Sequence, residues 1–205
     1  MKGKPPPVPY VTYEAMREQA DAFLRQHWPE REVPIDIEKI ADVRLGLDIV
    51  EVEGLKRQLG IDGFLSRDRG TIYIDRQMSE SNESRFRFTL AHEIAHREWH
   101  QALYEYADFA TPEEWLEFQQ ALPRELYARY EHQAYCYAGL LLVPKEALRV
   151  GVDRATAHAK AHNYNVNLED DADRAYVAEW VADDFEVSAS VILKRGKYDG
   201  LWTKE

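Results

Sequence analysis

Residues 92–96 read His-Glu-Ile-Ala-His and carry the side chains best suited to chemistry. Residues four apart lie on one face of an α-helix, about 6 Å apart along its axis. Two imidazoles at this spacing can each place a nitrogen about 2.1 Å from one zinc ion. Glu93 projects about 100° away from His92. We therefore expect Glu93 to flank the metal as a general base that takes a proton from metal-bound water.

The alternative for this segment is a surface helix whose histidines meet only water. Phe86, Leu90 and Ile94 form an apolar stripe on the same segment, and Ala91 and Ala95 permit close packing. This pattern is typical of a buried helix. Buried polar side chains need partners, and a metal ion would satisfy both histidines. The pattern therefore favours metal ligation.

Zinc in a peptidase needs a third protein ligand and one open position. Glu131 is our candidate because it shares a helix face with Ala134 and Ala138, and small residues let a carboxylate approach a neighbouring helix. His132 is the rival ligand, although it points about 100° away from that face. An ordinary solvated glutamate is the alternative interpretation of Glu131.

The remaining histidines are weaker candidates. Three ligands on one straight helix would span about 12 Å from His92 to His100, so His100 is expected to be a residue behind the ligands or on the surface. His158 and His162 repeat the spacing but lack an apolar face, and we interpret them as solvated.

Other side chains could serve the same site. Cys136 is a potential zinc ligand, but its apolar neighbours are typical of a small buried hydrophobe. Tyr130, Tyr135 and Tyr137 could donate to a developing oxyanion, although packing is the more common role of a tyrosine. These alternatives stay open.

The periodicity of the chain predicts the elements that must position these residues. Ser81 is a plausible N-cap for the helix that carries the histidine pair, and Thr111 should open an inserted helix. Three β-branched segments predict a small antiparallel-type sheet with a turn at 68–70. Helices are expected at 13–28, 36–43, 82–100, 111–121, 124–142, 153–162, 168–184 and from 188 to about 194, and strands at 47–52, 61–65 and 71–74.

We therefore expect an α+β fold with N-terminal helices, a small antiparallel-type sheet and a mainly helical C-terminal half that includes the active-site helix. Residues 1–10 contain four prolines and are interpreted as an extended arm, followed by a single domain over residues 11–205.

Composition excludes several functional classes. The 205 residues are 45% hydrophobic and 31% charged, which allows a buried core with a solvated surface. The net charge of −11 argues against direct nucleic-acid binding. No apolar run could cross a membrane, and the N-terminus does not resemble a secretory signal, so a cytoplasmic protein is expected. The single Cys136 excludes an intrachain disulfide and an all-thiolate zinc cluster.

Three motifs resemble those of the ImmA/IrrE-type metallopeptidases. Residues 85–96 match the helix pattern R-x-x-F-T-x-A-H-E-x-x-H, and residues 131–144 match E-x-x-A-x-x-F-A-x-x-L-L-x-P with Tyr137 in place of phenylalanine. Residues 185–188 match F-x-V-S, and the predicted strands at 63–64 and 72–74 are similar to the family's sheet. The resemblance covers roughly residues 35–195.

The resemblance implies a zincin fold in which His92, His96 and Glu131 hold one Zn2+ per chain and Glu93 is the base. It also implies an intracellular regulatory protein, such as a transcriptional regulator, as substrate. Many relatives carry a DNA-binding helix-turn-helix module, and no separate module of that kind is evident here. The helix predicted at 111–121 is an insertion between the two metal-binding motifs.

The leading hypothesis is a zinc-dependent endopeptidase that hydrolyses a peptide bond in a protein or peptide substrate. The first alternative is a regulatory or scaffold protein that holds a metal without cleaving. A second alternative is a DNA-binding regulator that uses the cluster of Lys194, Arg195 and Lys197, and the net charge of −11 opposes it.

Overall fold

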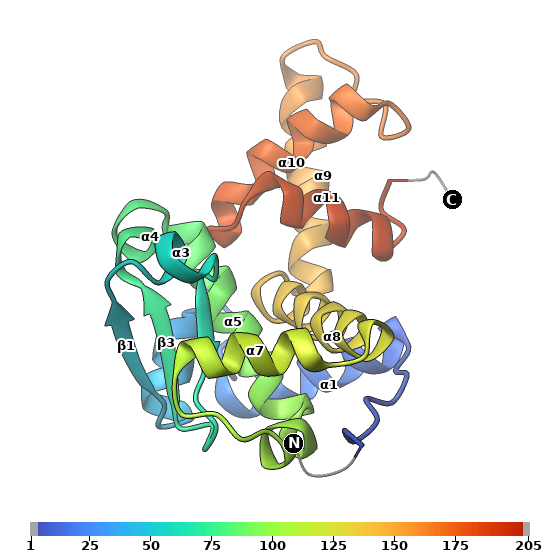
Figure 1. Cartoon of the computed structure of the whole chain (residues 1–205). Helices are drawn as coiled ribbons and strands as arrows, with labels where there is room; N and C mark the ends of the chain where they lie inside the picture. The colour runs from blue at the N-terminus through green and yellow to red at the C-terminus, as the bar shows by residue number, and fades with distance from the viewer. Residues whose placement is uncertain (1–3, 203–205) are drawn as a thin grey trace.

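The computed structural model describes residues 4–202, so the first three residues of the expected arm and the last three of the expected domain lie outside the described residues. The fold is α+β and mainly helical, as predicted (Figure 1). In chain order the elements are α1 (Tyr13–His27), α2 (Ile37–Lys39), the π-helical η1 (Ile40–Arg44), β1 (Asp48–Val52), α3 (Leu55–Leu59), β2 (Gly63–Leu65), β3 (Thr71–Asp75), α4 (Arg76–Ser81), α5 (Glu83–Trp99), α6 (Gln101–Tyr106), α7 (Pro112–Ala121), α8 (Arg124–Leu142), α9 (Lys145–Ala161), α10 (Asp171–Phe185) and α11 (Ala189–Tyr198).

The sheet is mixed, which corrects the expectation of an antiparallel-type sheet. The strand order is β1-β3-β2, with β2 antiparallel to β3 and β1 parallel to β3. Strands β2 and β3 form a hairpin, whose turn Asp68 stabilises by accepting from the backbone N–H of Gly70. The polypeptide passes from β1 through α3 and β2 before it forms β3, so β1 and β3 are joined by a crossover and not by a tight turn. This longer connection lets the two strands run parallel. Apolar alternation along a strand is the same in either orientation.

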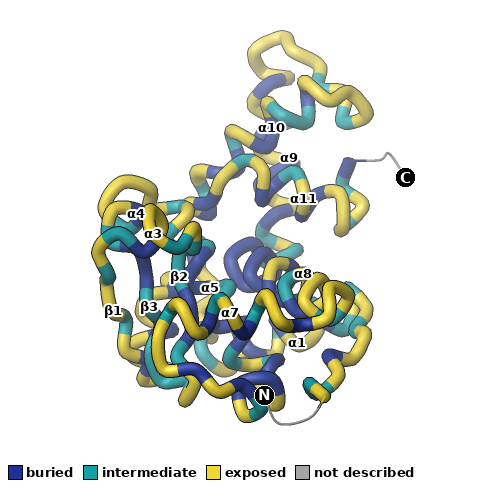
Figure 2. The backbone as a smooth tube through the Cα atoms, in the orientation of Figure 1, coloured by how far each residue is buried: buried dark blue, intermediate teal, exposed yellow. Residues whose placement is uncertain are grey.

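The core lies where α5 meets α8. Leu90 and Ile94 of α5 are fully buried, as are Ala134 and Ala138 of α8. Alanines on both helices let the two backbones approach closely, so that side chains from one helix reach the other. Figure 2 shows the buried backbone at this contact and the exposed loop between α9 and α10.

Several helix ends differ from the predicted ones. The short helix α4 occupies Ser81, so Asn82 caps α5 and its side chain accepts from the N–H of Arg85. Helix α9 begins at Lys145, directly after the proline that ends α8, rather than near residue 153. Pro144 separates the two helices, because a proline cannot continue α8 and its fixed φ suits the start of α9.

The inserted helix α7 forms as predicted. Thr111 accepts from the N–H of Glu114, and the Glu114 side chain accepts in return from the N–H of Thr111, which completes a capping box. Pro112 stands at the first turn of the helix. This insertion therefore has a well-defined beginning from local sequence alone.

The C-terminal helices α9, α10 and α11 extend away from the sheet (Figure 1). Within residues 4–202, every helix is too short or too polar to cross a lipid bilayer. At the other end of the chain, Val8 of the arm is buried. The carbonyl of Val8 accepts from Arg129, which holds the arm along α8.

Candidate metal centre

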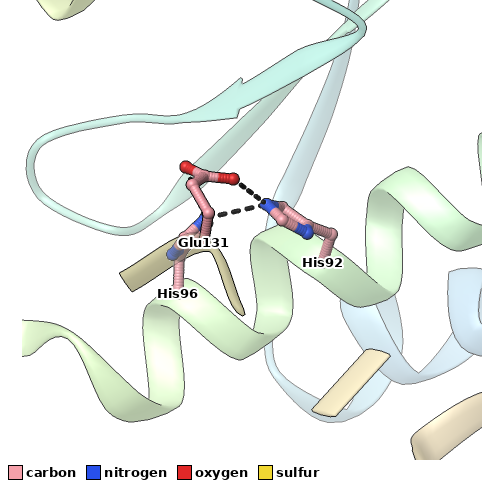
Figure 3. A group of neighbouring side chains, drawn as sticks. All are labelled: His92, His96 and Glu131. Atoms are coloured by element: carbon pink, nitrogen blue, oxygen red, sulfur yellow. Dashed lines mark hydrogen bonds and ion pairs between the residues drawn. The ribbon is translucent and has the colours of Figure 1, made fainter. Parts of the chain in front are cut away.

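His92, His96 and Glu131 lie together at the contact between α5 and α8 (Figure 3). Their ligand atoms are all within 4.8 Å of one another. The Nε2 atoms of the two histidines are 2.9 Å apart. The Glu131 carboxylate is 3.3 Å from His92 Nε2 and 3.9 Å from His96 Nε2. The histidine nitrogens and the carboxylate therefore point toward a common position.

This spacing suits a tetrahedral metal ion. Ligand atoms about 2.1 Å from a tetrahedral zinc lie about 3.4 Å from one another, and the observed separations straddle that value. Two imidazole nitrogens and one carboxylate oxygen leave a fourth position open, as in catalytic zinc sites. Within residues 4–202, no second group of three such side chains comes together.

Glu93 lies beside this group but differs from Glu131 in its surroundings. Its side chain is buried, and its Oε2 atom has no hydrogen-bond partner within residues 4–202. Burial raises the pKa of Glu93 to about 7; His92 opposes the rise and Glu131 adds to it. Burying a carboxylate oxygen without a hydrogen-bond partner costs free energy. This oxygen can therefore gain stabilisation by accepting a hydrogen bond from a water molecule or a substrate.

The two histidines also differ from each other. Burial lowers the pKa of His92, but its hydrogen bond to Glu131 and the charges of Glu93 and Glu131 outweigh burial, and the net pKa is raised. Burial, with His92 and His100 nearby, holds the pKa of His96 well below its usual range. His96 is therefore neutral, which is the form that binds a metal.

A peptidase family model described as the IrrE N-terminal-like domain matches residues 44–197, which include both α5 and α8. The chain belongs to this peptidase family. No curated protein matches the chain. The family match confirms the resemblance recognised in the three sequence motifs, and it covers the helices that carry the candidate ligands.

A layer of buried polar side chains lies behind the candidate ligands. His100 is 3% exposed and its Nδ1 lies 2.9 Å from His96 Nδ1. Burial lowers the pKa of His100 to about 4, so this ring is neutral as well. Tyr130 stacks on the His96 ring at 4.0 Å between centroids, and its hydroxyl hydrogen-bonds that of Tyr104. Of the two positions expected for His100, behind the ligands or on the surface, the structure shows the first.

In front of the candidate ligands, a cleft of about 320 Å³ opens beside His92, His96 and Glu131. Four aromatic side chains line it: Phe88, Trp115, Tyr127 and Tyr135. Trp115 comes from the inserted helix α7, which also places Gln119 Nε2 3.5 Å from Glu131 Oε1. The insertion thus forms part of the cleft wall.

The other sequence candidates lie elsewhere. His132 faces Cys136, with 3.6 Å between Nε2 and Sγ, and neither lines the cleft. His158 and His162 lie at the C-terminal end of α9, where their rings meet at a tilt and His158 stacks on Trp180. Both residues are exposed, as expected for a solvated pair.

Two of the tyrosine candidates are also accounted for by packing. Tyr130 is fully buried behind His96, and Tyr137 packs edge-on against Trp99. Tyr135 remains at the cleft, where its hydroxyl accepts from Lys194. Of the C-terminal cationic cluster, Lys194 thus faces Tyr135 and Arg195 is buried.

Proposed function

We propose that this protein is a zinc-dependent endopeptidase in which His92, His96 and Glu131 hold the metal and Glu93 is the general base. The observation that carries this proposal is the convergence of three ligand atoms within 4.8 Å beside a buried carboxylate oxygen that has no hydrogen-bond partner among the described residues. Family membership supports peptidase chemistry independently of that geometry.

The chain's own residues define the reaction. A zinc ion held by these three side chains would polarise the scissile carbonyl and acidify the attacking water. Glu93 accepts the proton of that water at its carboxylate and passes it to the leaving amine. The pKa of about 7 suits both transfers, since a group poised near the working pH gains and loses a proton with little cost. Aromatic side chains form the walls of the cleft in which this step would take place.

The cleft also limits the substrate. A space of about 320 Å³ admits a short segment and not a folded domain, so a protein substrate must present an exposed, extended stretch. We propose that the substrate is a cytoplasmic regulatory protein, such as a transcriptional regulator, with a cleavable segment of this kind. Phe88, Trp115 and Tyr127 favour apolar side chains next to the cleaved bond.

The substitution Glu93→Gln tests the mechanism. It removes the proton acceptor but keeps the side-chain volume and the three ligands. Cleavage of a peptide library, read by mass spectrometry, should fall by about 10²–10⁴-fold, the usual cost of losing a general base. Glu98→Gln is the matched control, because Glu98 is exposed on the same helix and pairs only with Arg97 among the ion pairs of the described residues. Both variants should keep their zinc.

Equal cleavage by the Glu93→Gln variant and the parent would overturn the assignment of the base. A zinc-loaded parent that cleaves neither the library nor co-purifying proteins would instead favour the alternative of a metal-holding regulatory protein.

A further inference from the structure

A chain of hydrogen bonds runs from the candidate metal centre to the N-terminal arm. His96 Nδ1 lies 2.9 Å from His100 Nδ1, and His100 Nε2 lies 3.1 Å from Gln133 Oε1. The other half of that amide, Gln133 Nε2, donates to the carbonyl of Pro9 at 2.6 Å. These hydrogen bonds therefore join α5, α8 and the arm through four residues.

The direction of this chain follows from its last member. A backbone carbonyl can only accept a hydrogen bond, so the NH2 group of Gln133 must face Pro9 and its oxygen must face His100. That oxygen also only accepts, so the proton of the neutral His100 ring must be on Nε2. His100 Nδ1 is then an acceptor, and it takes its proton from His96 Nδ1.

The consequence appears at His96 Nε2. A neutral imidazole with its proton on Nδ1 has a lone pair on Nε2, and Nε2 is the atom that faces His92 and Glu131. Reversing the Gln133 amide would set two oxygens 2.6 Å apart and remove this order. We propose that Gln133 and His100 are positioning residues that fix the tautomer and ring orientation of His96, and that the Pro9 carbonyl of the arm sets their direction.

The surrounding residues hold the hydrogen-bonded side chains in place. Gln133 and His100 are both 3% exposed, so water does not compete for their hydrogen bonds. Arg129, one helical turn before Gln133, donates to the carbonyl of Val8 at 2.9 Å and keeps the arm against α8. Tyr130 fixes the plane of the His96 ring from the other side. The arm is thus a supporting part of the site, although it lies outside the family match over residues 44–197.

This inference rests on the proposed function, in which His96 is a metal ligand, and two measurements separate them. The first needs no variant. Ring 15N NMR of the metal-free parent at about pH 7.5 should show His96 protonated on Nδ1 and His100 on Nε2, each as a single tautomer. His100 protonated on Nδ1, or a mixture at either ring, would overturn the inference.

The second measurement is zinc affinity by chelator competition. Gln133→Met keeps the length of the side chain and removes both hydrogen-bonding groups. It should weaken zinc binding by about 10–100-fold, the usual effect of losing a residue that orients a histidine ligand. It should also convert His96 and His100 to tautomer mixtures. Gln101→Met, an exposed glutamine of α6 that bonds Glu105, is the matched control and should bind zinc as the parent does.

The outcomes separate the two proposals. If the parent binds no zinc but shows the expected tautomers, the proposed function fails and the hydrogen-bond chain stands. If the parent binds zinc and a folded Gln133→Met protein keeps the parent's affinity and tautomers, the positioning role is wrong. Should that variant not fold, the parent's ring spectra still decide the inference.

Discussion

At the scale of single residues, the two glutamates of the site show how surroundings separate identical side chains. Glu131 is about 30% exposed and lies within ion-pair distance of both histidines. Glu93 is 5% exposed and keeps an unpartnered oxygen within residues 4–202, and its pKa is raised to about 7. A partly solvated carboxylate beside two imidazoles suits a metal, whereas a buried one with a raised pKa suits proton transfer.

The assignment of Glu131 as third ligand leads to a test against its neighbour. Glu131→Ala should lose most of the single zinc per chain, because two histidines alone hold the ion weakly. His132→Ala should keep its zinc, since His132 faces Cys136. Elemental analysis of both purified variants measures the difference. Full zinc in Glu131→Ala together with loss in His132→Ala would move the third ligand to His132.

The reactivity of the Cys136 thiol should depend on pH. Burial raises the pKa of this thiol to about 11, although Lys194 opposes the rise. The thiolate is the reactive form, so at pH 8 its population should be about a hundredfold below that of a thiol with the ordinary value near 9. Alkylation by iodoacetamide, followed by mass spectrometry, should therefore be slow in the native chain and should speed up as pH rises toward 11. Equal rates in the native and urea-unfolded chains would contradict this expectation.

At the scale of elements, the site depends on how closely β2 approaches α5. Gly63 of β2 lines the cleft, and a Cβ atom there would lie 2.7 Å from the carbonyl oxygen of Tyr73 and 2.9 Å from Cγ2 of Thr89. Thr89 is one turn before Glu93 on α5. The absence of a side chain at Gly63 therefore allows the strand to lie against the helix that carries the base.

Gly63→Ala should lower the free energy of unfolding by about 1–3 kcal/mol, the usual cost of forcing an extra methyl group into a packed contact. Urea denaturation followed by circular dichroism measures this change. Gly70→Ala, in the turn that joins β2 and β3, is the control, because the atoms nearest to its Cβ would be those of Asp68, at an ordinary 3.5 Å or more. A Gly63→Ala variant as stable as the Gly70→Ala variant would mean that β2 and α5 separate at no cost.

At the scale of the whole molecule, α11 docks the C-terminal helices onto the body that holds the site. Arg195 of α11 donates to the carbonyl of Val143, which caps α8, and pairs with Asp199 at 2.8 Å. Asp199 also accepts from the hydroxyl of Tyr13 in α1. One buried ion pair therefore links the first helix, the ligand-bearing α8 and the last helix.

Arg195→Met should destabilise the chain by about 3–5 kcal/mol, because it removes the partner at 2.8 Å and leaves the buried Asp199 charge with only Arg17, at 3.9 Å, among the ion pairs of the described residues. A double variant, Arg195→Met with Asp199→Leu, should recover part of that loss because it removes both charges. Lys197→Met is the control, since Lys197 is exposed on the same helix. Thermal or urea unfolding gives the values. A single variant as stable as the control would show that the pair does not hold α11 in place.

Much of the site followed from local sequence. A helix places residues four apart on one face whatever surrounds it, so the pairing of His92 and His96 needs no tertiary information. The same holds for the capping box that opens α7 at Thr111. The alanine face of α8 also indicated that Glu131, and not His132, would turn toward the neighbouring helix.

Only the tertiary structure decided the remainder. The orientation of β1 depends on a crossover, and the alternation of apolar residues along a strand is the same for parallel and antiparallel pairing. The cleft wall at Trp115 and the support of His96 by Gln133 and Pro9 join residues distant in sequence. No local pattern around Gln133 in the sequence predicts that it contacts His100 and the arm. Its role arises because packing removes water from Gln133, and each of its polar atoms must then find a partner within the protein.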